Sequence, residues 1–355
     1  MKKKFALALS VVLAGSTFLG ACSSDDKKEE GNKKEAADIK VGMVTDTGGV
    51  DDKSFNQSTW EGLQQFAKDN GLTIDKDVKY QLSTSDADYE PNLTNFAENG
   101  FDLTYGVGFL LADSVKTVAG KYPDNNFSII DAVVDAPNVA SITFKEHEGS
   151  FLVGVIAAMT TKTNKVGFVG GVDGDLIKKF EVGFKAGVQA VNPEIEVMTQ
   201  YAGDFNKPEK GASIAASMYG QGADIIYHSS GNTGNGVFTE AKNRSKKGEK
   251  VWVIGVDRDQ HAEGLPEDVT LTSMVKRVDL AVQSVSKDVL NDTFPGGKIV
   301  EFGLDTDAVG IAVNPESQKN VTKEALDKVE EFKGKIKSGE IKVPATIDEL
   351  KAFKL

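Results

Sequence analysis

A loop that follows the first apolar run of the chain carries the densest set of side chains able to bind a ligand. It reads Thr45-Asp46-Thr47-Gly48-Gly49-Val50-Asp51-Asp52-Lys53-Ser54-Phe55-Asn56. Its carboxylates can accept hydrogen bonds from ligand hydroxyls, its aromatic ring offers a stacking face, and its amide both donates and accepts. We therefore favour Asp46, Phe55 and Asn56 as binding residues. Asp51 and Asp52 fit better in the first turn of a helix, where the macrodipole favours anions.

A second loop, Gly231-Asn232-Thr233-Gly234-Asn235-Gly236, follows an apolar run that ends in Tyr227 and His228. Its glycines would let a ligand approach the backbone at a helix N-terminus, which makes Gly231 a candidate binding residue. The order of the glycines does not match G-x-G-x-x-G, so no dinucleotide site is expected. Tyr227 fits a core aromatic and a stacking residue equally well.

Charged residues also follow other apolar runs. Asp131 ends the run that starts at residue 126, and Asp257 follows Val253-Ile254-Gly255-Val256. Consecutive strand residues point to opposite faces, so we expect Asp257 to accept ligand hydroxyls at a cleft edge rather than to pair with Arg258. Lys276 ends the run Ser273-Met274-Val275, where it either donates to a ligand oxygen or is solvated.

The composition argues against several other functions. Acidic residues outnumber basic ones by 53 to 41, and the net charge of -12 does not suit a nucleic-acid partner. One cysteine and three histidines cannot form an internal disulfide or an ordinary structural zinc site. The sequence has no Walker A, H-E-x-x-H or G-x-S-x-G motif. We therefore expect no metal and no cofactor, and the missing motifs argue against several classes of enzyme.

The first residues have the pattern of a secreted lipoprotein. Three lysines precede an apolar run at 5–19, and Leu19-Gly20-Ala21-Cys22 resembles a bacterial lipobox. We expect residues 1–21 to be a signal peptide, Cys22 to carry lipid and residues 22–38 to form a flexible polar tether. The apolar run is shorter than the roughly 20 residues that a spanning helix needs. The predicted location is the extracytoplasmic face of the cell membrane.

The elements that position these residues alternate between strands and helices. Strands are predicted at 39–44, 77–82, 102–107, 126–131, 139–143, 165–169, 195–201, 224–228 and 251–256. Helices are predicted at 57–69, 91–98, 111–121, 150–160, 176–191, 207–219, 235–246 and 322–338. This alternation is typical of βαβ units on parallel sheets, and its restart after residue 148 indicates two α/β lobes. Ligands bind beyond the carboxyl ends of parallel strands, so the candidate residues should surround one cleft.

At these residues the sequence resembles the basic membrane protein family of substrate-binding lipoproteins, specifically its purine nucleoside receptors that serve ABC importers. The resemblance runs from about Val41 to Val313, and its motifs lie at 46–57, 127–133, 148–154, 234–237, 251–260 and 271–279. It implies the type I periplasmic-binding-protein fold, with two doubly wound parallel-sheet lobes joined by three crossings. We accordingly expect one lobe of 39–143 plus 272–297 and another of 144–271 plus 298–355.

The resemblance also implies a site that binds without chemistry, so we expect no enzymatic activity. Its residues would be Asp46, Phe55, Asn56, Asp131, Tyr227, Gly231, Asp257 and Lys276. Phe55 and Tyr227 would sandwich a purine base. Asn56 and Asp131 would read the edge of that base, and Asp257 and Lys276 would hold the ribose hydroxyls. The implied partners are a purine nucleoside such as inosine, guanosine or adenosine and the permease and ATPase subunits of an ABC importer, and the protein is expected to be a monomer.

Two other functions stay open at this point. Nucleoside hydrolases carry a D-x-D-x-G-x-D-D calcium motif that the Asp46 to Asp52 loop partly matches. However, Val44 occupies the position of the first aspartate, and an extra residue separates Gly48 from Asp51. A sugar or autoinducer receptor of the same fold would also use stacking aromatics, and only the family resemblance favours a nucleoside over such ligands.

Overall fold

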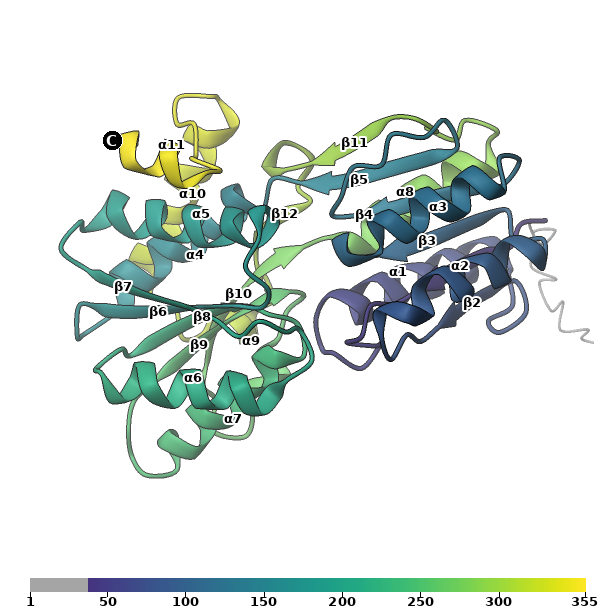
Figure 1. Cartoon of the computed structure of the whole chain (residues 1–355). Coiled ribbons are helices and arrows are strands. Elements are labelled where there is room, and N and C mark those ends of the chain that lie inside the picture. Colours follow the sequence, from purple (N-terminus) through teal and green to yellow (C-terminus); the bar gives the residue numbers. More distant parts are fainter. Residues whose placement is uncertain (1–37) are drawn as a thin grey trace, which may run out of the picture. The chain divides into compact units, whose positions relative to one another are not determined.

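Two six-stranded sheets organise residues 38–355, which are the part of the chain that the computed structural model describes (Figure 1). The predicted signal peptide, Cys22 and all of the predicted tether except Asp38 lie outside these residues. Within the described part, no helix is both long and apolar enough to cross a membrane.

The first sheet is entirely parallel and has the strand order β11-β5-β4-β3-β1-β2. Its strands are β1 (Val41–Val44), β2 (Val78–Gln81), β3 (Leu103–Val107), β4 (Asn126–Ile130), β5 (Val139–Phe144) and β11 (Ile299–Phe302). The helices are α1 (Phe55–Asn70), α2 (Tyr89–Glu98), α3 (Ala112–Lys121) and α8 (Val278–Leu290). Helices α2 and α3 cover one face of the sheet and α1 and α8 cover the other, so β1 and β3 are buried along their whole length.

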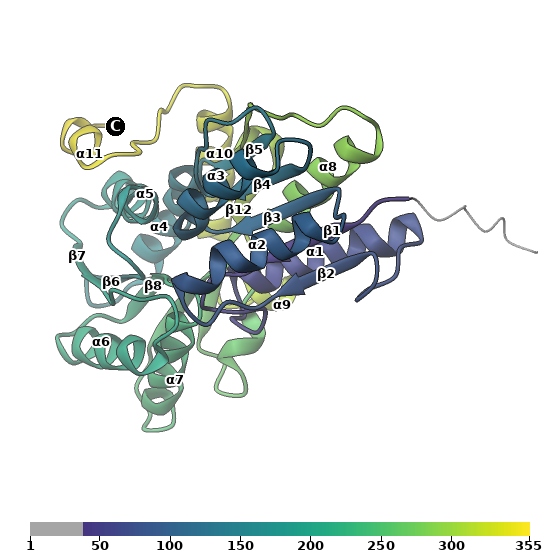
Figure 2. The same ribbon diagram turned by 45° about the vertical axis from the view of Figure 1, so that its right-hand side comes forward.

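The second sheet has the order β12-β10-β9-β8-β6-β7 and is parallel except for the pairing of β10 with β12. Its strands are β6 (Lys165–Gly170), β7 (Glu196–Tyr201), β8 (Ile225–Ser229), β9 (Trp252–Asp257), β10 (Thr270–Lys276) and β12 (Val309–Ile311). Its main helices are α4 (Glu146–Thr160), α5 (Asp175–Val191), α6 (Pro208–Gly220) and α7 (Thr233–Ser245). Figure 2 shows α6 and α7 on one face of the sheet and α4 and α5 on the other.

The remaining helices lie near the end of the chain or are short turns. They are α9 (Pro315–Gln318), α10 (Lys323–Lys337), α11 (Ile347–Ala352) and the 3-10 helices at Asp86–Asp88, Phe109–Leu111, His261–Gly264 and Leu304–Thr306. Helix α10 packs on α4, and α11 packs on α5. Both belong to the lobe built on the second sheet.

The predicted fold class is confirmed. Every predicted strand and helix overlaps an element of the structure, and the two parallel sheets form the two lobes. The chain passes between the lobes three times: from β5 to α4, from β10 to α8 and from β11 to β12. In the sequence, each crossing adjoins the end of a strand that borders the cleft.

The lobe boundaries differ from the expected ones at two strands. The expectation put residues 272–276 in the first lobe, whereas β10 pairs with β9 and β12 in the second sheet. It put β11 in the second lobe, whereas this strand pairs with β5 in the first sheet. Both strands adjoin a crossing. An apolar run at such a place predicts a strand but does not show which of two parallel sheets the strand joins.

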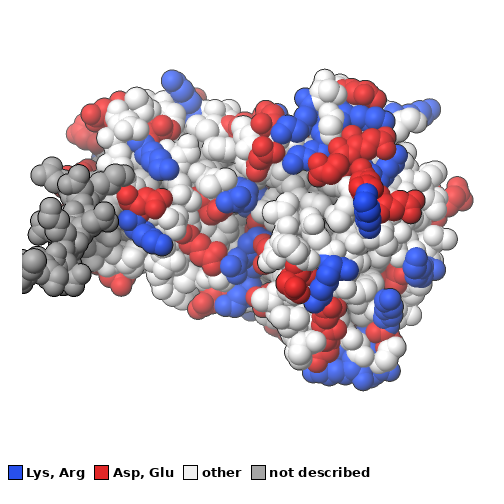
Figure 3. Space-filling model, turned by 180° about the vertical axis from the view of Figure 1, so that it is seen from behind, with Lys and Arg blue, Asp and Glu red and all other residues white. Residues whose placement is uncertain are grey.

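Charged side chains are spread over the surface of both lobes. On the face seen in Figure 3, lysine and arginine alternate with aspartate and glutamate, and no single large basic patch is visible. Both signs are frequent on that face, as expected for a sequence with 41 basic and 53 acidic residues.

Candidate functional site

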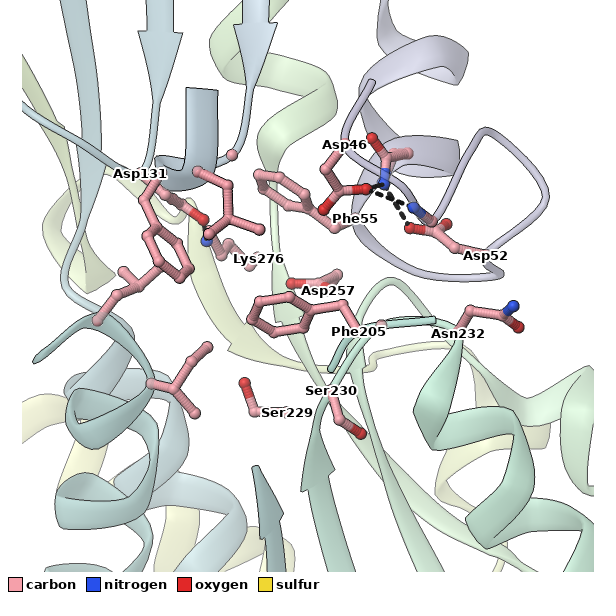
Figure 4. A pocket seen from close by; sticks show the side chains of 18 of the residues that line it. Asp46, Asp52, Phe55, Asp131, Phe205, Ser229, Ser230, Asn232, Asp257 and Lys276 are labelled. Carbon is pink, nitrogen blue, oxygen red and sulfur yellow. Dashed lines mark hydrogen bonds and ion pairs between the residues drawn. The ribbon is translucent and has the colours of Figure 1, made fainter. Parts of the chain in front are cut away.

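A pocket lies where strands of both sheets end, and it holds about 550 Å³ of space between protein atoms, counting the part open to solvent (Figure 4). Residues of the first lobe that line it are Asp46, Gly48, Asp52, Phe55, Asn56, Gly108, Phe109, Leu110 and Asp131. Residues of the second lobe that line it are Leu176, Ile177, Phe180, Phe205, Ser229, Ser230, Gly231, Asn232, Asp257 and Lys276. The structure thus brings seven of the eight predicted site residues around one space.

Tyr227 is the exception, and the prediction that it reaches the cleft is wrong. Its side chain is fully buried in the second lobe, with ring centroids 5.2 Å from Phe184 and 5.6 Å from Phe168. Its hydroxyl lies 3.1 Å from the hydroxyl of Ser150, and burial raises its pKa. Tyr227 stands two residues before the end of β8, and the pocket begins only at Ser229. Tyr227 therefore lies about 6.6 Å along the strand from the first residue of β8 that lines the pocket.

Phe205 supplies the aromatic ring that Tyr227 was expected to provide. It lies in the loop after β7, and it extends from the second lobe toward the same space that Phe55 enters from the first lobe (Figure 4). Its ring also meets the ring of Phe109 edge-on, with centroids 6.0 Å apart, so this contact crosses from one lobe to the other. Phe205 could have been predicted as a site residue from the sequence, because it follows a predicted strand just as Asp46 does.

A glycine sets the place of the Phe205 ring. A β-carbon on Gly171 would lie 2.2 Å from Cε1 of Phe205, which is closer than any real contact. The ring therefore lies directly against the backbone at Gly171, at the carboxyl end of β6. The glycine makes room for the aromatic wall of the pocket.

Asp46 and Asp52 form a buried pair joined by one amide. The side-chain nitrogen of Asn56 donates to Asp46 at 2.7 Å and to Asp52 at 3.0 Å. Burial raises the pKa of Asp46 to about 6, and it raises the pKa of Asp52 as well. Asp52 also accepts the backbone N–H groups of Asn56 and Gln57 at the start of α1. The prediction that Asp51 and Asp52 lie in the first turn of a helix is nevertheless wrong, because α1 begins at Phe55 and its first turn has no acidic residue, while Asp52 lines the pocket. Asp51 has an exposed side chain and does not take part.

A second charged group gathers around Lys276, whose side chain is 1% exposed. The ammonium lies 2.5 Å from Asp131 Oδ2 and 3.6 Å from Glu146 Oε1. Burial opposes the charge of Lys276, but the attraction of Asp131, Glu146 and Asp257 raises its pKa overall. The alternative of a solvated lysine is therefore wrong.

Asp257 accepts a hydrogen bond from the hydroxyl of Ser54, and burial raises its pKa to about 7. Arg258 pairs instead with Glu61 at 2.9 Å, so the expectation that Asp257 does not pair with its neighbour is confirmed. Asp131 and Asp257 share an unusual backbone, with φ angles of 68° and 64°. Each stands just at the carboxyl end of a parallel strand, where this conformation redirects the chain at the border of the cleft.

The loop between β1 and α1 also joins the lobes by hydrogen bonds away from the pocket. Side-chain amides of the second lobe donate to three of its backbone carbonyls: Asn206 to Thr47 at 2.7 Å, Asn235 to Asp52 at 3.1 Å and Gln260 to Lys53 at 2.9 Å. These contacts close the cleft on one side.

The pocket can stack a flat ring and can hydrogen-bond a ligand that carries several donors. Four carboxylates and one ammonium line it, together with the Ser229 and Ser230 hydroxyls. Within residues 38–355, no group of three or more His, Cys, Asp or Glu side chains is arranged to hold a metal ion. His147, His228 and His261 do not line the pocket, and His228 is buried with Nε2 3.0 Å from Gln260 Oε1.

Comparison with known proteins identifies the family. The family model described as ABC transporter substrate-binding protein PnrA-like, or Bmp, matches residues 39–347. The chain belongs to the Bmp family. Bmp proteins are substrate-binding components of ABC transporters, which agrees with a pocket set between two lobes and with the predicted family resemblance.

Three relatives of this Bmp protein cover nearly its whole length. The CD4+ T-cell-stimulating antigen of Listeria innocua is 53% identical over 97% of the chain and 99% of the relative. The ABC transporter nucleoside-binding protein BmpA of Lactococcus lactis is 40% identical over 97% of the chain and 100% of the relative. Basic membrane protein A of Borreliella burgdorferi is 34% identical over 88% and 90%, respectively.

Solved structures show the same fold for this Bmp protein. An ABC transporter solute-binding protein from Aeropyrum pernix superposes with a TM-score of 0.78 at 31% identity, covering 88% of the chain and 96% of that structure. A periplasmic solute-binding protein from Actinobacillus succinogenes with bound D-allose gives a TM-score of 0.60 at 14% identity, covering 79% and 99%. The second likeness supports the fold alone.

Proposed function

We propose that this protein captures a purine nucleoside in the cleft between its lobes and delivers it to an ABC importer. The observation that carries the proposal is the pairing of Phe55 and Phe205 from opposite lobes beside the buried Asp131, Asp257 and Lys276. The two phenylalanine rings can stack on a flat base, and the two aspartates with the lysine can hydrogen-bond the hydroxyls of a ribose. The 40% identical relative from Lactococcus lactis is named a nucleoside-binding protein, which supports the same ligand class.

The base would lie between Phe55 and Phe205, since aromatic stacking adds roughly 0.5 to 1.5 kcal/mol beyond the area that it buries. Asp46 and Asn56 lie together on the first lobe and would contact the base edge. Asp131 pairs with Lys276 and not with Asn56. We therefore assign Asp131 to the ribose side with Lys276 and Asp257, in place of the base-reading role first expected.

The charge of the pocket favours an uncharged ligand that is rich in hydrogen-bond donors. Four carboxylates face one ammonium, so a phosphate group would meet net negative charge. A nucleoside offers ribose hydroxyls that donate to carboxylates, and such charge-assisted hydrogen bonds belong to the stronger class. Nucleotides should therefore bind much more weakly than the matching nucleosides.

Calorimetric titration of a version that begins at residue 23 tests the proposal. Inosine, guanosine and adenosine are the test ligands, and uridine, ribose and inosine monophosphate are the comparisons. We expect saturable heat with at least one purine nucleoside and little or none with ribose or the nucleotide. Binding of ribose alone would overturn the nucleoside assignment in favour of a sugar receptor.

We also propose that the protein is a receptor without catalytic turnover. The pocket holds no histidine and no arranged metal ligands among the described residues, which argues against a hydrolase of the calcium-dependent kind. Incubation with inosine and calcium should release no hypoxanthine above the blank. Sustained release would identify a nucleoside hydrolase instead.

The proposed anchor is a lipid on Cys22, which would hold a monomer on the extracytoplasmic face of the membrane through the polar segment that follows. The support is the Leu19-Gly20-Ala21-Cys22 sequence after a basic and apolar start. Cys22→Ser should move the protein from the membrane fraction to the soluble fraction of cells. An unchanged membrane fraction would refute the anchor.

A further inference from the structure

The Lys276 ammonium is held from behind by residues that do not line the pocket. Glu146 lies 3.6 Å from it at the first residue of α4, and the Glu146 side chain is 0% exposed. Lys179 of α5 in turn lies 3.2 Å from the other Glu146 oxygen. Lys179 also donates to the backbone carbonyl of Phe144 at 3.3 Å. Charges therefore alternate from the pocket wall toward the surface, in the order Asp131, Lys276, Glu146 and Lys179.

This row of charges runs past two of the crossings between the lobes. Lys276 ends β10 just before the crossing to α8, and Glu146 follows the crossing from β5. Asp131 comes from the first lobe, so its ion pair with Lys276 joins the lobes inside the cleft. The position of the ammonium thus depends on the residues at the crossings as well as on the pocket.

We propose that Glu146 is a positioning residue for the ligand, one that keeps the Lys276 ammonium charged and directed at the pocket without touching the ligand itself. Lys179 in turn keeps the Glu146 carboxylate charged and in place. The inference rests on the proposed function, because it concerns the lysine that would hold the ribose.

The surroundings of Lys276 show why it needs this support. The rings of Phe55, Phe144 and Phe180 lie around the ammonium, with centroids 4.9, 5.0 and 5.5 Å from Nζ. A lysine taken out of water into such surroundings tends to lose its proton unless anions hold the charge. Aromatic faces attract a cation, but more weakly than a carboxylate at close range.

Three carboxylates face the ammonium: Asp131 after β4, Asp257 at the end of β9 and Glu146 on α4. Asp131 and Asp257 line the pocket and are available to the ligand, and burial raises the pKa of Asp257 to about 7. The charge of Asp257 therefore varies within the physiological range of pH. Burial raises the pKa of Glu146 as well, while the attraction of Lys276 and Lys179 opposes that rise. Glu146 is the carboxylate that a ligand cannot reach, so it can face the lysine in the empty and the filled pocket alike.

In residues 38–355, two carboxylate oxygens near Lys276 lack a hydrogen-bond partner, and their positions fit a ligand-binding role for Asp131 and a supporting role for Glu146. Asp131 Oδ1 and Glu146 Oε1 are both buried without a hydrogen-bond partner within the described residues. Asp131 Oδ1 belongs to a residue that lines the pocket, so a ligand hydroxyl can satisfy it. Glu146 Oε1 faces Lys276 at ion-pair distance, and it stabilises the ammonium by charge rather than by a hydrogen bond.

The test compares Glu146→Gln with Glu181→Gln. Glu181 is a buried carboxylate of α5 that pairs with Lys185 and accepts the Tyr201 hydroxyl, but it does not contact Lys276. Affinities of both variants and of the parent for inosine are measured from pH 6.5 to 9. The ratio of variant to parent at each pH cancels any ionisation of the nucleoside. We expect Glu146→Gln to bind a few-fold more weakly at pH 6.5 and more weakly still at pH 9, because a lower pKa of Lys276 leaves fewer charged ammonium groups at high pH. The additional loss at pH 9 reaches about tenfold where the Lys276 pKa has fallen to about 8.

A second measurement needs no ligand. Lysine labelled with ¹³C at the ε carbon reports the titration of each ammonium by NMR, and Lys276→Arg assigns the resonance. In the parent, Lys276 should titrate above the ordinary lysine value despite its burial, and in Glu146→Gln it should titrate lower. The Glu181→Gln titration should match the parent.

The outcomes separate the inference from the proposed function. A parent protein that binds no nucleoside refutes the function, while the NMR titration still decides the role of Glu146. A parent that binds inosine, with Glu146→Gln showing the same pH profile and the same lysine titration, overturns the inference. If Glu146→Gln does not fold, the parent titration decides alone, since a Lys276 midpoint below the ordinary lysine value would also overturn it.

Discussion

The side-chain amide of Asn206 in the second lobe donates to the backbone carbonyl of Thr47 in the first lobe at 2.7 Å. The same loop of the first lobe receives the amides of Asn235 and Gln260, again on backbone carbonyls. The acceptors belong to the loop that carries Asp46 and Asp52, and the donors are residues that do not line the pocket. Contacts independent of the ligand therefore help to hold the lobes together.

Removing one of these contacts should speed the release of ligand. Asn206→Ala deletes the hydrogen bond to Thr47 and the one that Asn206 Oδ1 accepts from Asn232 at 2.6 Å. Each is worth about 0.5 to 1.5 kcal/mol, so the nucleoside dissociation rate should rise by at least about 2-fold. Association should change less than dissociation, because every pocket-lining side chain is kept. Stopped-flow displacement measures both rates. Asn243→Ala, an exposed position on α7, is the control, and equal dissociation rates in the two variants would contradict the prediction.

The two aromatic residues should separate binding from stability. Phe205→Leu removes a stacking face from the pocket, so nucleoside affinity should fall by at least about 2- to 12-fold, as expected for a loss of 0.5 to 1.5 kcal/mol. Tyr227→Phe removes the contact with Ser150 in the core, so it should lower the free energy of unfolding by about 1 kcal/mol and leave affinity unchanged. Calorimetry and thermal melting measure these effects. A loss of affinity in Tyr227→Phe alone would return the stacking role to that residue.

A single methyl group should displace the Phe205 ring. Gly171→Ala puts a β-carbon where the ring now lies, so the ring must move and the nucleoside should bind at least a few-fold more weakly. Gly174→Ala is the matched control, because nothing lies within 4 Å of its β-carbon position and its φ angle of -178° suits any residue. Equal affinities of the two variants for inosine would show that the ring does not contact the ligand.

The raised pKa of Asp257 makes closure of the empty cleft depend on pH. The closed pocket raises this pKa from 3.8 to about 7 by burial, whereas an open cleft would return the carboxyl to water. Closure therefore takes up a proton between these two values, and the closed fraction should fall as pH rises through that window and level off above about 7. The slope is at most about tenfold per pH unit for one group. Asp46, with a pKa of about 6, acts in the same direction.

Small-angle scattering of the ligand-free protein measures this effect as a radius of gyration that grows between pH 4.5 and 7.5. Asp257→Asn carries no titrating group at that position, so the change with pH should be clearly smaller. A radius that is the same across this range in the parent would refute the linkage.

Residues at the carboxyl ends of strands were predictable from the sequence. Asp46, Asp131, Asp257 and Lys276 each follow a buried apolar run, and in a parallel sheet such ends share one edge. The structure places all four around the pocket for that reason. The same rule, applied to the predicted strand at 195–201, would have drawn attention to Phe205 as well.

Tyr227 shows where the sequence was insufficient. A central parallel strand is buried on both faces, so its residues read as a continuous apolar run. Such a run does not show where the strand meets the cleft, and a difference of two residues decides whether a ring lines a pocket or a core. Glu146 was missed for a related reason, since only the tertiary contact with Lys276 shows that its charge has a partner.

The left-handed backbone conformation at Asp131 and Asp257 means that thermal stability and ligand recognition place opposite demands on these two positions. A residue other than glycine in this region costs about 1 to 3 kcal/mol, although aspartate tolerates it better than most. Glycine at either position would relax the chain, but it would also delete a carboxylate meant for the ligand. At Asp131 it would in addition leave the buried Lys276 ammonium without its nearest counterion, which destabilises the folded state. An engineering effort that selects only for survival at high temperature should therefore reach Asp257 before Asp131 and produce stable proteins that no longer bind the ligand. A durable biosensor built on this scaffold needs its stabilising changes away from the strand ends that border the cleft.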